Sequence, residues 1–119
     1  MPVSMNDVRR VLDPEEPDYA AAAQLGEEAL PHLAVLVAGP DPMLASKAAY
    51  AASLLQGDIG ADVVRAASAS TDPVVRVAAA AGARNLSASV AREAITRLLN
   101  DDDAGIRKVV RAALERPGR

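Results

Sequence analysis

The feature that most constrains this chain is a pattern that returns every 31 residues. Asp41, Asp72 and Asp103 stand 31 residues apart. Residues of like character share this spacing at further positions, namely Leu44, Val75 and Ile106; Leu33, Val64 and Ile95; Leu36, Ala67 and Leu98; and Tyr19 and Tyr50. Self-similarity at a fixed period of this length is typical of repeat units that stack on one another.

Each unit carries the start signals of a helix. Asp41-Pro42 and Asp72-Pro73 place a capping carboxylate before a proline, which suits the first helical position. Apolar residues follow at helical spacing, and no run alternates with period two as a strand would. A further helix is expected from about Pro17 to Leu25, because Pro17 suits a first turn. The sequence therefore predicts an all-α protein of about eight helices in antiparallel pairs.

The repeat pattern also divides the chain. With 119 residues, it is the size of one domain. We expect a single repeat domain over 1–119, made of an N-terminal capping helix (1–12), three repeats (13–40, 41–71 and 72–102) and a C-terminal half-repeat (103–119) that frays from Arg116 onward. A helix pair cannot hide its apolar face alone, so each unit is expected to pack mainly on its neighbours.

Composition and charge exclude several classes of protein. The chain has no Cys, which rules out disulfides and thiolate metal sites. No apolar run is long enough for a signal peptide or a membrane span, so we expect a soluble cytoplasmic protein. Arg outnumbers Lys, a bias typical of GC-rich bacteria. Residues 1–60 hold nine acidic and three basic side chains, whereas residues 61–119 hold seven acidic and ten basic ones.

Candidate catalytic and metal-binding residues are few. His32 is the single histidine, and its neighbours Pro31 and Leu33 offer neither a metal ligand nor a catalytic partner. The run Asp101-Asp102-Asp103 lacks the ligand spacing of a calcium loop and is explained by a turn and a helix cap. We therefore expect no catalytic residue, no metal and no cofactor.

The units resemble the HEAT repeat family. Asp72-Pro73-Val74-Val75-Arg76 is similar to the first helix of that repeat, and Ala29-Leu30-Pro31-His32-Leu33 to the second. The resemblance covers residues 13–115 and is strongest over 72–100; it departs from the family at Ala45, where Arg is usual, and at Asp62 and Glu93, where Pro is usual. It implies a short right-handed α-solenoid.

The family resemblance gives some residues a structural role. These repeat residues are Asp41, Pro42, Asp72, Pro73, Arg76, Asp103 and Arg107. Asp72 and Arg76 are four residues apart, as are Asp103 and Arg107, a spacing that allows an ion pair within one helix. In HEAT-like stacks such residues usually tie neighbouring repeats together.

HEAT arrays mostly bind proteins, so the resemblance implies a non-catalytic protein–protein interaction scaffold. The second helix of each pair is expected to present the partner-binding residues, which we predict as His32, Val35, Asp62, Arg65, Glu93, Thr96 and Arg97. This surface is mixed in charge and suits another protein. Self-association through the ends of the stack is a further hypothesis, with Arg107, Lys108, Arg111 and Arg116 forming a partial polar cap.

Two other functions stay open. Some HEAT-like folds bind nucleic acid, and the Arg-rich second half could provide a basic face. The acidic net charge of −3 and the lack of Phe and Trp disfavour this reading. Other HEAT-like folds are chromophore lyases or DNA glycosylases, which makes an enzyme the third alternative on fold analogy alone.

Overall fold

The structure is a computed structural model, and it describes residues 2–115; the predicted fraying tail, including Arg116, lies outside them. The described residues form eight α-helices: α1 (Met5–Leu12), α2 (Tyr19–Gln24), α3 (Leu30–Ala38), α4 (Pro42–Ser53), α5 (Ala61–Ser68), α6 (Pro73–Gly82), α7 (Ala88–Ile95) and α8 (Ala104–Leu114). Four short 3-10 segments join them: η1 (Gly26–Ala29), η2 (Gln56–Asp58), η3 (Ala83–Asn85) and η4 (Thr96–Asn100). No strand occurs in 2–115, so the all-α prediction is confirmed.

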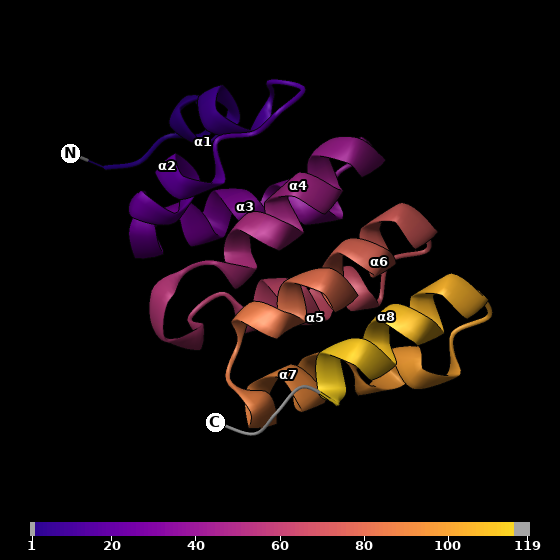
Figure 1. Ribbon diagram of the computed structural model, residues 1–119. Helices are drawn as coiled ribbons and strands as arrows, with labels where there is room; N and C mark the ends of the chain where they lie inside the picture. The colour runs from indigo at the N-terminus through magenta and orange to yellow at the C-terminus, as the bar shows by residue number, and fades with distance from the viewer. Residues whose placement is uncertain (1, 116–119) are drawn as a thin grey trace.

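The helices lie in two layers (Figure 1). In one layer α4 packs on α6, and α6 packs on α8. In the other layer α3 packs on α5, and α5 packs on α7, while α3 also packs on α4 and α5 on α6. The short helices α1 and α2 lie at one extreme of this arrangement, and α7 and α8 lie at the other. Sequence order thus becomes spatial order along the molecule.

The long helices of the first layer begin where the aspartates predict. The Asp41 carboxylate accepts hydrogen bonds from the amides of Met43 and Leu44 at the start of α4. Asp72 accepts from the Val74 amide at the start of α6. Asp103 does the same for the Ile106 amide in α8. Such caps satisfy amides that have no partner inside the helix, and each contributes about 1 kcal/mol.

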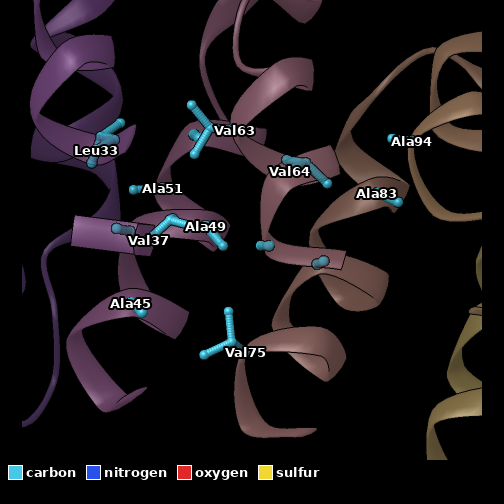
Figure 2. Close-up of a cluster of buried hydrophobic side chains, with 14 of the residues drawn as sticks. Leu33, Val37, Ala45, Ala49, Ala51, Val63, Val64, Val75, Ala83 and Ala94 are labelled. Carbon is cyan, nitrogen blue, oxygen red and sulfur yellow. The ribbon is translucent and has the colours of Figure 1, made fainter. Parts of the chain in front are cut away.

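The core between the helices is built mainly from small side chains. Ala48 and Ala49 of α4 and Ala79 and Ala80 of α6 are fully buried. Figure 2 shows side chains from both layers gathered in the space between them, among them Leu33, Ala49 and Val75. Because alanine adds little width, α4 and α6 approach closely, and larger branched residues fill the centre.

One helix begins later than predicted. The second helix begins at Tyr19 rather than at Pro17, because the Asp18 carboxylate caps it by accepting from the Ala21 amide. The helix α7 ends at Ile95, and the chain continues as η4. Helix propensity alone does not locate such ends, since local hydrogen bonds decide them.

The turn between α4 and α5 depends on a close approach of two backbones. A Cβ atom at Gly60 would overlap the Ala52 carbonyl oxygen and would lie 2.6 Å from the Ala52 carbonyl carbon. Gly60 itself has φ −89°, which any residue adopts. Earlier in the same turn, Gly57 has φ 77° with no atom near its missing Cβ. Gly60 is therefore required by space and Gly57 by backbone conformation.

The two tyrosines of the chain meet where α2 docks on α4. The rings of Tyr19 and Tyr50 pack edge to face with centroids 5.0 Å apart. Burial raises the pKa of Tyr19, and the neighbouring Tyr50 adds to the effect. This aromatic contact fastens the short α2 to the larger layer.

No helix within residues 2–115 has the length and apolar character needed to cross a lipid bilayer.

Candidate functional site

Arg65 holds three of the predicted partner-binding residues together. Its Nη1 lies 2.7 Å from Asp62 Oδ1 on α5, and its Nη2 lies 2.9 Å from Glu93 Oε1 on α7. The Arg65 side chain is 39% exposed, and those of Asp62 and Glu93 are 89% and 72% exposed. Exposed pairs of this kind contribute at most about 1 kcal/mol. The Arg65 cluster (Asp62, Arg65 and Glu93) therefore fixes the charge pattern of the α5–α7 face more than it stabilises the fold.

Arg97 lies beside a cavity next to this face. The cavity has a volume of about 350 Å³ and opens between the end of α5 and the segment from η4 to α8. Its polar lining is Ser68, Ser70, Arg76, Arg97, Asn100, Asp101 and Asp102. No ion pair within residues 2–115 engages Arg97. The Arg97 cavity thus offers a guanidinium to a carboxylate or carbonyl group of a bound molecule.

A partly buried ion pair forms one wall of the Arg97 cavity. Arg76 Nε lies 2.8 Å from Asp101 Oδ2, and the two side chains are 19% and 6% exposed. Arg76 Nη1 also donates to the carbonyl oxygens of Ser70 and Thr71, each at 3.1 Å. Arg107 donates to the Asp101 carbonyl oxygen. Arg76 therefore ties α6 and the turn before it to the turn before α8.

This network corrects the pairing predicted within each helix. Arg76 does not pair with Asp72, and Arg107 does not pair with Asp103. The reason is that the Asp72 and Asp103 carboxylates already accept the amide hydrogen bonds that start α6 and α8. Both arginines bond to Asp101 instead, a residue that the sequence assigned only to a turn. Arg76 donates to its carboxylate and Arg107 to its backbone carbonyl oxygen. The sequence signal for this role was the run of three aspartates before α8, since a helix cap needs only one of them.

The ion pair also sets how Asp101 titrates. Hydrogen bonds from Arg76, and then from the Asp103 amide, hold the pKa of the Asp101 carboxyl below its usual range. A carboxyl with a lowered pKa in the folded state stabilises the fold above its unfolded pKa. That contribution is lost as the pH falls through the lower folded value.

We expect the pH dependence of stability to differ between the wild type and Asp101→Asn. The wild type should be the more stable protein at pH values above the ordinary pKa of an Asp carboxyl, and the difference should shrink as the pH falls through the lowered pKa of Asp101. All other carboxyls titrate in both proteins, so they cancel. Urea unfolding at several pH values measures the difference. A difference that stays constant down to the lowest pH would contradict the assignment.

His32 and Val35 lie apart from the Arg65 cluster along α3. His32 Nε2 is 2.8 Å from the Val3 carbonyl oxygen, and the Val3 amide donates to Glu28 Oε1 at 3.1 Å. His32 therefore holds the segment before α1 against α3. Val35 is 61% exposed and gives the α3 end of the face an apolar character. Thr96 is exposed at the junction of α7 and η4.

The described residues of this face offer charged groups for recognition. No group of three or more His, Cys, Asp or Glu side chains in 2–115 is placed to hold a metal ion. The Ser68 hydroxyl donates to the Arg65 carbonyl oxygen, and no histidine lies within hydrogen-bonding distance of it. The arrangement can bind a molecule that has both acidic and basic groups.

Comparison with known proteins shows the fold. No protein-family model and no curated protein sequence matches the chain. A solved structure of human deoxyhypusine hydroxylase in complex with glycerol is similar, with a TM-score of 0.70 and 21% sequence identity. The match covers 95% of this chain and 44% of that enzyme. The chain therefore spans less than half the length of the enzyme whose fold it shares.

This match corrects the predicted function. The prediction of a non-catalytic scaffold, and with it the expectation that the chain is not an enzyme, followed from the resemblance to HEAT repeats and is wrong. The solved protein that shares the fold over nearly the whole chain is an enzyme. A stack of paired helices of this kind is thus not restricted to passive protein binding.

Proposed function

We propose that the chain is the substrate-binding part of an enzyme that hydroxylates a protein side chain. The observation that carries this proposal is the shared fold, over 95% of the chain, with an enzyme whose name states that it hydroxylates deoxyhypusine. The support is fold analogy. The α5–α7 face adds a surface on which a substrate could bind. We assign binding and positioning to the described residues, because they form a charged face and a cavity.

The architecture within this proposal is a short right-handed α-solenoid of HEAT-like units over 13–40, 41–71 and 72–102. Its support is that residues 31 positions apart have the same environment. Asp41, Asp72 and Asp103 each cap a helix. Leu44, Val75 and Ile106 are each buried, as are Leu33, Val64 and Ile95. A cytoplasmic location and a bacterial source stay predictions.

The substrate is expected to lie along α3, α5 and α7. Glu93 and Asp62 expose carboxylate oxygens beyond those that Arg65 uses, and these suit Lys or Arg side chains of a protein segment. Arg97 suits an acidic side chain or a backbone carbonyl beside the cavity. Exposed Val35 provides an apolar contact at the other end. Alternating charges of this kind fix the register of a bound chain.

The test compares the proteome of source cells with and without this chain by quantitative mass spectrometry. Loss of the chain should remove the mass of one oxygen atom from a defined set of peptides, and the wild-type chain should restore it. Arg97→Glu should lower the fraction of modified peptide about tenfold, because it places a like charge where the substrate carboxylate binds. Its thermal stability should match that of the wild type, since Arg97 is exposed.

Arg92→Glu is the matched control. Arg92 lies on α7 next to Glu93, is exposed, and takes part in neither the Arg65 cluster nor the lining of the Arg97 cavity. The same change of charge there should leave the modified fraction unchanged. If no peptide changes when the chain is absent, the proposed hydroxylating role is overturned. If Arg92→Glu and Arg97→Glu behave alike, the assignment of the site is overturned.

A further inference from the structure

One flank of α8 has no helix packed against it among the described residues. Ala49 of α4 and the equivalent Ala80 of α6 are fully buried, and α4 packs on α6 as α6 packs on α8. The residue 31 positions after Ala80 is Arg111, which is exposed. A position that is buried and apolar in the inner helices is therefore exposed and charged in α8.

The uncovered flank of α8 is basic. Lys108 is exposed beside Arg111, and no ion pair within 2–115 engages either side chain. Leu99 of η4 and Leu114 of α8 are only partly buried against the core. A partner for this surface needs carboxylates that reach Lys108 and Arg111, with modest apolar contact around them.

The opposite extreme of the molecule carries such carboxylates. The segment between α1 and α2 holds Glu15 and Glu16, which are exposed and form no ion pair with residues 2–115. Lys47 of α4 donates to the Pro14 carbonyl oxygen at 3.1 Å and so fixes this segment on the first layer. Figure 1 places α1 and α2 at the end far from α8.

We propose that a second copy of this chain docks its Glu15–Glu16 segment on the Arg111 flank of α8. The charges of the two ends are complementary, whereas two α8 flanks facing each other would repel. The contact is therefore head to tail and not symmetric. The inference rests on the charges of the ends and not on the proposed hydroxylation.

The proposed contact explains why a charged residue occupies the position in α8 that is a buried alanine in α4 and α6. Arg111 excludes an ordinary apolar helix, because burying an unpaired guanidinium is costly. It admits a surface that brings its own carboxylates. The association should be weak and should depend strongly on salt, since its charged groups lie near solvent.

The test measures association by sedimentation velocity over a range of protein concentrations, at about 20 mM and about 500 mM salt. The wild type should associate at low salt and dissociate at high salt. Arg111→Glu sets a carboxylate beside Lys108, and Glu16→Arg sets a guanidinium beside Glu15, so each variant has one end at which the attracting charges cancel. Each variant alone should associate at least tenfold more weakly than the wild type. An equimolar mixture of the two should regain association, because the unaltered basic flank of Glu16→Arg can meet the unaltered acidic segment of Arg111→Glu.

Arg65→Glu is the matched control, since it changes net charge as Arg111→Glu does but lies in the middle of the molecule. It should associate like the wild type. Circular dichroism confirms that each variant keeps its helices. A wild type that stays monomeric at high concentration and low salt would overturn the proposal. So would a mixture that associates no better than its components. Neither result bears on the peptides detected by mass spectrometry, so the two proposals fail separately.

Discussion

Gly60→Ala is expected to destabilise the fold by about 3 kcal/mol or more. The added methyl group would overlap the Ala52 carbonyl oxygen and crowd the Ala52 Cα at 3.1 Å. These are backbone atoms of α4, so no side-chain rotation relieves the overlap. Ala52 is fully buried, and α4 is held on both sides by neighbouring helices. The start of α5 must therefore move away from α4 and lose packing.

Gly57→Ala separates this steric effect from backbone strain in the same turn. Nothing lies within 4 Å of a Cβ at Gly57, but its φ of 77° is unfavourable for alanine. That strain costs about 1 to 2 kcal/mol. Denaturant unfolding of both variants gives the two losses. Equal losses for Gly57→Ala and Gly60→Ala would show that the close approach at Ala52 is absent.

Asp101→Ala is expected to lower stability by about 3 kcal/mol at neutral pH. The substitution leaves the Arg76 guanidinium, which is only 19% exposed, without its carboxylate partner. It also removes the acceptor of the Asp103 amide at the turn before α8. Both losses act on the same contact between α6 and α8. Thermal and denaturant unfolding measure the change.

The neighbouring Asp102→Ala provides the control for Asp101→Ala. Asp102 is exposed, and its substitution should change stability by less than about 0.5 kcal/mol. A double-mutant cycle with Arg76→Ala should give a coupling energy of about 2 kcal/mol between Arg76 and Asp101. Additive losses in that cycle would contradict a direct interaction between the two side chains.

Much of the fold was predictable from the sequence because its signals are local. An aspartate before a proline starts a helix because its carboxylate accepts hydrogen bonds from amides of the first turn, so α4 and α6 begin where Asp41 and Asp72 predict. The period of the apolar residues likewise indicates which faces are buried, as at Leu33, Val64 and Ile95. Repetition strengthened each of these signals.

The contacts that escaped prediction join residues far apart in the chain. The partner of Arg76 could not be inferred from the sequence, because Asp72 lies nearer and has the spacing of a helical ion pair. Only the structure shows that Asp72 caps α6 and that Arg76 binds Asp101 instead. Nor does sequence show that His32 meets the Val3 carbonyl, 29 residues earlier. The residues of the α5–α7 face were predicted as a set, and the structure joins Asp62, Arg65 and Glu93 among them.

Function was the least predictable property, because one arrangement of helices can host different activities. The scaffold prediction transferred the usual role of HEAT arrays to this chain, and the shared fold with a hydroxylase removes the ground for it. No spacing of residues in the sequence distinguishes the two roles. The distinction lies in what the exposed face binds, which composition alone leaves open.

The contact between Tyr19 and Tyr50 makes the molecule its own optical probe. The chain has two Tyr and no Trp or Phe, so near-ultraviolet absorbance and circular dichroism arise from this pair alone. These signals report whether α2 is seated on α4, while far-ultraviolet circular dichroism reports all helices together. Comparing the two during unfolding shows directly whether the N-terminal end detaches before the rest of the chain melts.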